Sequence, residues 1–391
     1  MSHNYRLKYE LFKYRDLNDF HHAHDAYLAA VLGEYQKNYI NNINFEQLRE
    51  ISQELHEKKL YSDLRYGYVI NSIDKRVQTY HQKTGEIFDA EKFNKIVENT
   101  IYQNDIMVSR KTEIKTGEFY NQTKNSKNAK VNEKAIFPLK DNLDTKKYGS
   151  YGSSNCAYII LLNVIKKGKE KQIMIGIPII IHEKAKNNSK IREEFIRNYL
   201  DISENDEVKI IKDYIPFNTL INYEGQSVRI KGYSLSKKGF ELNNAMQLKL
   251  EKKLAQEWKY TLNYLFNNKN IPRKKDSDGK WIEDSIITDD EFNQQLNQIF
   301  IYLIEKIKKY YPLYKNVANS FGKFVFDEYD WDTKKYLILE LFKLLHANAS
   351  NANLKKIGLG EAAGRLNEKK IKHGKIIYQS VTGIKEKDYE F

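Results

Sequence analysis

The chain has 391 residues, 41% of them hydrophobic, which excludes a disordered tail and allows two or three domains with buried cores. Its 65 basic and 52 acidic residues give a net charge of +13; this favours a polyanionic partner such as nucleic acid, and the codon bias of an AT-rich genome is the alternative explanation. The single cysteine, Cys156, excludes a disulfide framework within one chain, and no signal peptide or membrane span is found, so a reducing cytoplasm is the expected location.

The first hundred residues are predicted to be mainly helical. Residues 9–14 are mostly apolar or aromatic and predict a short strand. A helix from Phe20 follows, because residues 16–19 offer capping side chains, and Gly33 can end it. The remaining elements predicted in this part are helices at about 44–59 and 92–101, a turn at 84–86 and a strand at 106–108.

The rest of the chain is predicted to mix strands with long helices. Residues 109–149 lack a hydrophobic period and hold ten basic and five acidic residues, so we expect a basic loop or linker and a domain boundary near it. The strands are expected at 158–165, 171–181, 208–215, 219–230 and 376–383, with turns at 166–170 and 224–225. The helices are expected at 190–199, 245–266, 289–309 and 333–346. These elements predict an α/β or α+β fold.

Three histidines and an aspartate lie close together as His21, His22, His24 and Asp25. On a helix, His22 and His21 lie three and four residues before Asp25 and share its face, whereas His24 points elsewhere. A carboxylate suits Mg²⁺ or Mn²⁺, and a histidine one turn earlier can take a proton from water near neutral pH. The pattern predicts half of a metal-dependent phosphodiesterase site, because two-metal hydrolysis needs further carboxylates. The alternative is a buried polar helix end, and we assign His24 to it.

The stretch Lys13–Leu28 resembles the third RuvC segment of the type II CRISPR RNA-guided DNA endonucleases, whose helix carries His-His-x-His-Asp-Ala-Tyr. In that family the second histidine and the aspartate are the active-site residues. The resemblance therefore implies catalytic and metal-binding roles for His22 and Asp25 and a structural role for His21. Further matches to the II-A subtype follow in order at Thr84–Ile87, Lys111–Phe119, Asp144–Gly149 and Gln379–Ile384.

The resemblance also implies a layout. Residues 1–112 would form a partial RNase H-like RuvC nuclease segment. A mixed α/β domain that reads the protospacer-adjacent motif (PAM) would follow, with an N-terminal subdomain at 113–215 that holds a phosphate-binding loop and a C-terminal subdomain at 216–391. In such enzymes the protein reads only the PAM, and guide RNA pairing reads the remaining sequence.

Two sets of DNA-contacting residues follow from the resemblance. The family's loop after Thr-Gly-x-Phe holds a target-strand phosphate, and the corresponding residues here are Asn121, Gln122, Thr123 and Lys124. The alternative is an ordinary surface loop. The family's best-known PAM-reading arginines have no Arg-x-Arg counterpart here, so we expect Arg365, Lys370 and Lys372 to contact bases or phosphates and the PAM to differ from a guanine-rich one. A solvated basic hairpin is the alternative for these three.

The resemblance also implies partners and limits. The family's first two RuvC segments, bridge helix, recognition lobe and HNH nuclease have no counterpart in this sequence. We therefore expect no cleavage by this chain alone, with Mg²⁺ or Mn²⁺ as the cofactor of an assembled enzyme. The expected partners are guide RNA (crRNA and tracrRNA), target DNA with its PAM, the missing N-terminal portion of the nuclease and anti-CRISPR inhibitors. The alternatives are a stand-alone basic DNA-binding module and, ranked last, an unrelated metal hydrolase.

Overall fold

A computed structural model of the chain describes residues 6, 8, 9, 11, 13–15, 17–41, 53, 78–102, 109–117, 123–126, 137–140, 143–152, 155–267, 273–275, 281–283, 289–321, 326–347, 352–354, 366–380 and 386–391. The chain divides into two compact units. Unit 1 contains Met1–Met107 together with Lys249–Lys259, and unit 2 contains Val108–Leu248 and Tyr260–Phe391. The division shows that a short segment from the middle of the sequence belongs to the N-terminal unit.

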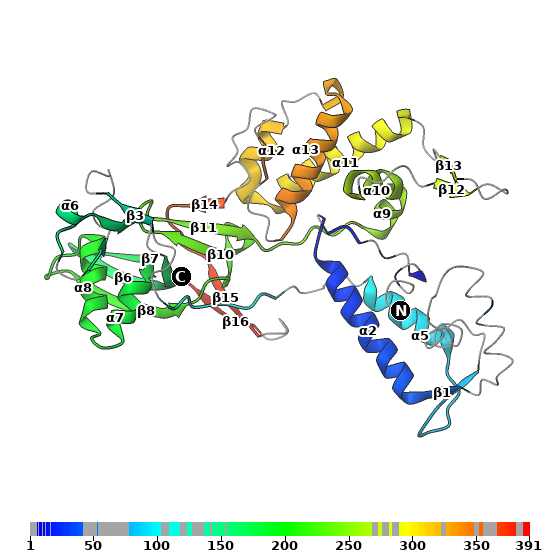
Figure 1. The fold of residues 1–391 in the computed structure, drawn as a ribbon, viewed down its shortest axis with the longest axis horizontal. Coiled ribbons are helices and arrows are strands. Elements are labelled where there is room, and N and C mark those ends of the chain that lie inside the picture. Colours follow the sequence, from blue (N-terminus) through cyan, green and yellow to red (C-terminus); the bar gives the residue numbers. More distant parts are fainter. Residues whose placement is uncertain are drawn as a thin grey trace. The chain divides into compact units, whose positions relative to one another are not determined.

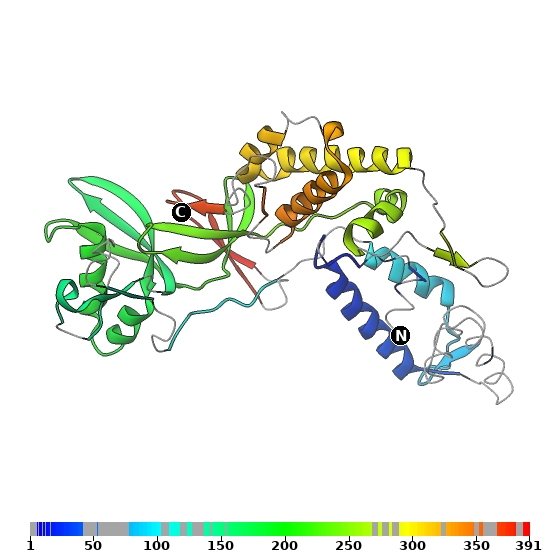
Figure 2. The ribbon, with the colours of Figure 1, turned by 45° about the horizontal axis from the view of Figure 1, so that its top comes forward.

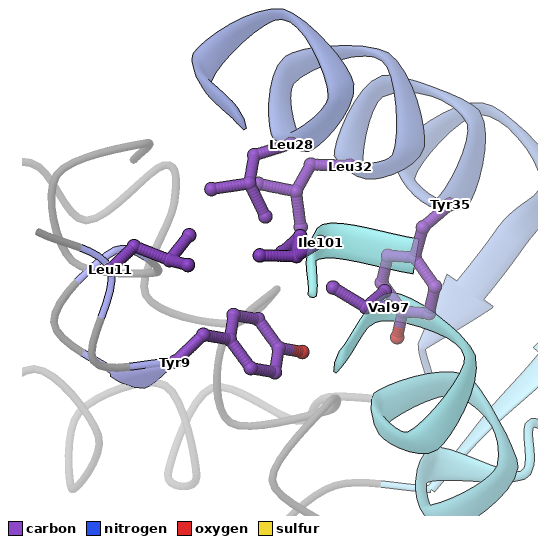
Figure 3. Close-up of a cluster of buried hydrophobic side chains, with 7 residues drawn as sticks. All are labelled: Tyr9, Leu11, Leu28, Leu32, Tyr35, Val97 and Ile101. Carbon is purple, nitrogen blue, oxygen red and sulfur yellow. The ribbon is translucent and has the colours of Figure 1, made fainter. Parts of the chain in front are cut away.

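Unit 1 is built on two helices, α2 (Phe20–Asn38) and α5 (Ala90–Ile101), which lie side by side (Figure 1). The hairpin of β1 (Tyr39–Asn41) and β2 (Thr79–His81) and the short helix α9 (Lys252–Glu257) complete its described elements. Its core gathers apolar side chains of α2, α5 and the N-terminal segment, and Figure 3 shows them pointing toward one another: Tyr9, Leu11, Leu28, Leu32, Tyr35, Val97 and Ile101. Burial of these side chains holds α2 in place, since apolar area removed from water is the main stabilising contribution in a core.

Two of the helices predicted for this unit, the one from Phe20 and the one at 92–101, are confirmed with shifted boundaries. The helix at 92–101 is confirmed as α5, which begins at Ala90. Asp89 caps its N-terminus, because the Asp89 side chain accepts a hydrogen bond from the Lys92 amide. The prediction that Gly33 ends the first helix is wrong. Leu32 and Tyr35 are buried on either side of it, and their burial outweighs the roughly 1 kcal/mol cost of an internal glycine.

Three other expectations for unit 1 have different outcomes. The turn at 84–86 is confirmed, with Gly85 at a φ of 70°. The strand at 9–14 is wrong for the described residues there, which are not in strand conformation, although Tyr9 and Leu11 contribute their side chains to the core. The helix at 44–59, apart from residue 53, and the strand at 106–108 lie outside the described residues.

The first sheet of unit 2 has the strand order β7-β6-β8, with every pair antiparallel. Its strands are β6 (Cys156–Lys166), β7 (Lys169–Pro178) and β8 (Glu207–Ile215). The central strand β6 is buried almost without interruption from Cys156 to Val164, as expected of a strand covered on both faces. The predicted hairpin is confirmed, since Lys167 and Gly168 both have positive φ, as its two-residue turn requires. The second strand ends at Pro178, earlier than expected, because residues 179–181 open a helix.

Two helices accompany this sheet, α7 (Ile179–Ala185) and α8 (Lys190–Leu200), and the second confirms the helix predicted at 190–199. Both lie beside the sheet in Figure 1 and Figure 2, where they are drawn in green. A small sheet with the order β3-β5-β4 and the one-turn helix α6 precede β6 in sequence. Their bounds are β3 (Thr123–Asn125), β4 (Phe137–Pro138), α6 (Thr145–Tyr148) and β5 (Ser150–Gly152).

The second sheet of unit 2 has six strands in the order β14-β11-β10-β9-β15-β16, again antiparallel. The predicted turn at 224–225 is confirmed, because Glu224 and Gly225 have the positive φ values of a two-residue hairpin turn. The C-terminal strand β15 pairs with β9, so residues some 150 positions apart in the sequence lie side by side in this sheet. The strands are β9 (Leu220–Tyr223), β10 (Gln226–Ser234), β11 (Gly239–Asn244), β14 (Leu366–Glu368), β15 (Lys375–Gln379) and β16 (Glu386–Glu390).

The long helices α11 and α13 of unit 2 pack against each other and confirm the helices predicted at 289–309 and 333–346. The helix predicted at 245–266 begins later, as α9 and α10, because Asn244 fixes the preceding segment through hydrogen bonds to the carbonyls of Met246 and Leu345. The remaining bounds are α10 (Lys259–Asn267), β12 (Arg273–Lys275), β13 (Trp281–Glu283), α11 (Asp289–Tyr310), η2 (Pro312–Tyr314), α12 (Lys315–Phe321), η3 (Phe326–Glu328) and α13 (Trp331–Leu345).

Helices and antiparallel sheets thus occur together, which confirms the mixed α/β class, in its α+β form. Within the ranges that the structure describes, no helix combines the length and apolar character needed to cross a membrane.

The same substitution at two glycines should have opposite effects on stability. A Cβ on Gly176 would lie 2.6 Å from Cys156 Sγ and 2.7 Å from Tyr233 Cδ1, whereas a Cβ on Gly33 would meet nothing within 4 Å. We expect Gly176→Ala to lower the free energy of unfolding by about 1–3 kcal/mol and Gly33→Ala to raise it by about 0.5–1 kcal/mol. Urea unfolding followed by circular dichroism measures both, and a Gly176→Ala variant as stable as the parent would contradict the close packing.

Candidate functional site

The histidine cluster lies in the first turns of α2, whose start is fixed locally. Asn18 Oδ1 accepts a hydrogen bond of 3.1 Å from the Phe20 amide, and the Asn18 carbonyl oxygen lies 3.2 Å from His21 Nδ1. Phe20 is itself buried, and its burial anchors the first turn of the helix within unit 1. The sequence folds this way because a polar residue just before an apolar helical face can bond the first free amides.

The helix distributes its histidines between interior and surface. His21 is 3% exposed, and burial, followed by the charge of His22, lowers its pKa. His22 is exposed, with its ring centroid 4.0 Å from that of His21. His24 is half-buried, lines a cavity with Phe20 and Tyr102, and hydrogen-bonds the backbone of Ile101. Only His22 of the three therefore faces solvent fully.

Asp25 is held by two cations. Arg6 Nη2 donates to Asp25 Oδ1, and Lys13 Nζ lies 3.6 Å from Asp25 Oδ2. The Arg6 side chain is 10% exposed and that of Asp25 31%, so the pair is shielded more on the arginine side. The charge of Arg6 also lowers the pKa of Lys13. Sequence reasoning missed Arg6, because it lies 19 residues before Asp25 and no helical spacing relates the two.

The described donor set does not form a metal site by itself. Asp25 is one carboxylate already engaged by Arg6 and Lys13, and His22 adds one imidazole. Among the residues that the structure describes, no three His, Cys, Asp or Glu side chains are grouped so as to hold a metal ion. Two-metal hydrolysis of a phosphodiester needs more ligands than this pair can supply.

The His24 environment predicts a loss of stability in mild acid. Burial lowers its pKa from 6.5 to about 4, and the charges of Arg6 and Lys249 act in the same direction. The unfolded chain therefore takes up the proton at a higher pH than the folded chain. This contribution to stability is complete above about pH 6.5 and is lost as the pH falls toward 4. We expect a smaller decrease in melting temperature between pH 7 and pH 4.5 for His24→Gln than for the parent chain; equal decreases would contradict this.

The predicted phosphate loop is only partly described. Asn121 and Gln122 lie outside the described residues, and only the backbone of Thr123 is described, at the start of β3. Lys124 is exposed and pairs with Tyr151 of β5. The segment that leads into the loop is held firmly, because Glu113 exchanges backbone hydrogen bonds with Phe217 and the Lys115 amide bonds the Ala157 carbonyl.

The predicted PAM-reading residues lie around the connection from β14 to β15. Arg365 lies outside the described residues. Lys370 and Lys372 are both exposed and flank Ile371, which is 4% exposed. The buried Ile371 side chain anchors this connection, and the lysines on either side of it remain in solvent. Lys370 and Lys372 belong to unit 2, whereas Asp25 belongs to unit 1.

Sequence reasoning also missed a buried arginine in the six-stranded sheet. Arg229 is 5% exposed, and burial lowers its pKa. It donates to the Asn218 carbonyl at 3.2 Å and to Gln379 Oε1 at 3.4 Å, so it connects β10 with the C-terminal strand β15. The Gln379 that carries the family resemblance is thus part of a sheet contact.

Comparisons with known proteins identify the family of the chain. A model of the Cas9 RuvC domain matches residues 1–113, and a model of the PAM-interacting domain of CRISPR-associated endonuclease Cas9 matches residues 116–387. The chain is 29% identical over 184 residues to the CRISPR-associated endonuclease Cas9 of Listeria innocua serovar 6a, over 43% of this chain and 13% of the relative. It is 30% identical over 191 residues to that of Streptococcus mutans serotype c, over 45% of this chain and 14% of the relative. Since the second model alone matches more than half of its residues, the chain belongs to the Cas9 family and carries RuvC and PAM-interacting domains of that family.

Proposed function

We propose that this chain recognises the PAM duplex of target DNA and contributes His22 and Asp25 to a RuvC site that cuts the non-target strand. The observation that carries the nuclease role is the orientation of α2. It leaves His22 exposed and Asp25 31% exposed, and it turns His21 into the interior. Residues that act on DNA must be reachable, and the two residues to which the family resemblance points are both reachable from solvent.

The proposed cofactor is Mg²⁺ or Mn²⁺, since RuvC domains of Cas9 generally use divalent metal ions. Such ions supply charge stabilisation at the phosphate and an activated water. In this chain Asp25 would offer one carboxylate ligand, and His22 would accept or donate a proton. Because the described residues supply too few ligands, the remaining ones would come from other parts of an assembled nuclease, and we propose that this chain does not cut DNA alone.

The proposed DNA-reading residues lie in unit 2. Asn121, Gln122, Thr123 and Lys124 would hold a target-strand phosphate, and Arg365, Lys370 and Lys372 would contact PAM bases or phosphates. The exposure of Lys124, Lys370 and Lys372 supports this, as does the net charge of +13. The proposed subdomains at 113–215 and 216–391 are supported by the two sheets, since β6–β8 precede residue 216 and the six-stranded sheet follows it.

The proposed partners follow from the family. They are crRNA and tracrRNA, target DNA with its PAM, the rest of the nuclease and anti-CRISPR inhibitors, in the bacterial cytoplasm. The printed names of the relatives describe CRISPR-associated endonucleases, and the chain aligns with only 13% and 14% of their lengths.

A salt titration of DNA binding tests the PAM-domain role. The Lys370→Ala and Lys372→Ala variants should each weaken binding of a PAM-containing duplex and reduce the slope of log K against log salt by about 1, if each lysine contacts a phosphate. Lys343→Ala is the matched control, because Lys343 is an exposed lysine paired with Glu340 on α13. Equal slopes for the lysine variants and the parent would remove these residues from the interface.

The second candidate is a stand-alone basic DNA-binding module without catalysis, which the net charge of +13 favours. Supplying the rest of the nuclease and guide RNA in trans separates the two functions. Guided cleavage that depends on Asp25 supports the first, and salt-sensitive binding that never leads to guided cleavage supports the second.

A further inference from the structure

One exposed tyrosine of unit 2 is held in a conformation that tyrosine rarely adopts. Tyr214 has a φ of 52°, in the left-handed region where a side chain with a Cβ is disfavoured. Its side chain is nevertheless 47% exposed, so burial of the ring does not account for the cost. Strained backbone at an exposed aromatic residue is the kind of outlier that accompanies binding sites.

A β-bulge produces this conformation. Along β6 the pairing with β8 advances two residues, from Ile159 to Leu161, while β8 advances three, from Ile215 to Lys212. The extra residue lies at Asp213–Tyr214 and turns the tyrosine outward. Bulges of this kind redirect side chains next to functional sites.

The outward ring is supported by a network of partly buried groups. Arg192 Nη1 donates to both carboxylate oxygens of Asp213, at 3.1 and 2.9 Å, and to the Tyr158 hydroxyl at 3.3 Å. Asp213 Oδ1 in turn accepts the Tyr214 amide at 2.9 Å. The side chains of Arg192 and Asp213 are 19% and 30% exposed, so solvent only partly screens the pair. The network fixes the backbone on which Tyr214 is carried.

Aromatic side chains back one side of the ring. The Tyr214 centroid lies 4.6 Å from that of the fully buried Tyr158 and 6.2 Å from that of His182, and the Arg192 guanidinium carbon lies 5.7 Å from it. The ring therefore presents a rigid flat surface to solvent with little rotamer entropy left to lose on binding.

The charges around the ring are balanced and are compatible with a polyanionic ligand that carries flat rings. The two carboxylates at the site are already paired, Asp213 with Arg192 and Glu183 with Lys186 at 2.6 Å, so they repel a phosphate chain little. Glu183 also accepts a hydrogen bond from the backbone of Gly117, which lies four residues before Asn121 of the proposed phosphate loop in the sequence.

We propose that Tyr214 is a stacking platform for an unpaired nucleobase of single-stranded DNA or RNA. The proposal rests on the nucleic-acid-binding role proposed above. Paired bases have their faces covered by neighbours in the duplex, so only an unpaired base can lie flat on an exposed ring, and such stacking is tolerant of sequence. The tyrosine hydroxyl is not required for it.

Fluorescence anisotropy of the full chain with labelled single strands of about 12 nucleotides tests this, in separate DNA and RNA arms, with a duplex of the same sequence as reference. Tyr214→Asn suits the left-handed backbone and removes the ring, Tyr214→Phe keeps the ring, and Tyr310→Asn removes another exposed tyrosine, on α11. We expect Tyr214→Asn to bind at least one of the single strands about tenfold more weakly. The other two variants should match the parent chain, and no variant should change duplex affinity.

Several outcomes would overturn the proposal. They are parent-like affinity of Tyr214→Asn for both single strands, an equal loss on the duplex, and an equal loss with Tyr214→Phe. A measurement on the parent chain is independent of variant folding: irradiation with a 5-iodouracil-containing strand should give an adduct on Tyr214, and adducts only elsewhere would count against it. A parent chain that binds neither strand nor duplex would contradict the proposed function itself, whereas binding that is indifferent to Tyr214 contradicts this inference alone.

Discussion

Asp25→Asn is expected to abolish cutting of one DNA strand when the chain is assembled with guide RNA and the rest of the nuclease, with a rate decrease of roughly 10³-fold or more. Asparagine keeps the shape of the side chain and an oxygen acceptor for Arg6, but it lacks the negative charge that the site needs. A group on which several kcal/mol of transition-state stabilisation depends has an effect of this size. Strand-specific cleavage of an end-labelled PAM-containing duplex measures it.

Two comparisons make this result specific. Asp19→Asn is the matched control, because it makes the same change at the residue before α2, and its rate should stay within about twofold of the parent. Melting curves of Asp25→Asn should show a folded chain with a lowered melting temperature, since Arg6 keeps an acceptor but loses its counter-charge. Normal cutting of both strands by Asp25→Asn would exclude Asp25 from the nuclease site.

Leu28→Ala is expected to lower the free energy of unfolding of unit 1 by about 3 kcal/mol. Leu28 is 1% exposed and lies among Leu11, Leu32 and Ile101 in the cluster of Figure 3, so truncation leaves a cavity as well as losing burial. A loss of about 3 kcal/mol is a large fraction of the free energy of unfolding of a typical domain, which is about 5–15 kcal/mol. Hydrogen exchange of α2 amides, with urea unfolding of the whole chain, measures the change.

The effect should stay within unit 1. Lys37→Ala, at an exposed position on the same helix, should change stability by less than about 0.5 kcal/mol. Amides of β6 should keep their protection in Leu28→Ala, because that strand belongs to unit 2. Uniform loss of protection across both units would show that they unfold together, contrary to their separate cores. Because α2 carries His22 and Asp25, we also expect the assembled nuclease to lose activity at a lower temperature.

Much of the secondary structure was predictable because its causes are local. The turns at Lys167–Gly168 and Glu224–Gly225 need residues that accept positive φ between apolar strands, and both are visible in the sequence. Helices α8, α11 and α13 follow from apolar periodicity. Boundaries failed where a distant partner decided them, as when Asn244 hydrogen-bonds the Leu345 carbonyl and delays the helix expected from residue 245.

The candidate site divides in the same way. The placement of His22 and Asp25 on one helix followed from the sequence, because residues three apart share a helical face. The pairing of Asp25 with Arg6 did not, because it joins residues 19 apart, a separation at which side chains do not share a helical face. Arg229 escaped notice for a similar reason, since its partner Gln379 is 150 positions away.

By itself, the sequence determined the family, the mixed fold class and the helix that carries the histidines, because motifs and hydrophobic periods are properties of neighbouring residues. The tertiary structure alone decided which cations neutralise Asp25, that Lys249–Lys259 joins the N-terminal unit, and that Tyr214 is turned outward on a bulge. Each of these depends on contacts between segments far apart in the chain. No local pattern encodes them, because their energies arise only when the packed core brings the partners within a few ångströms.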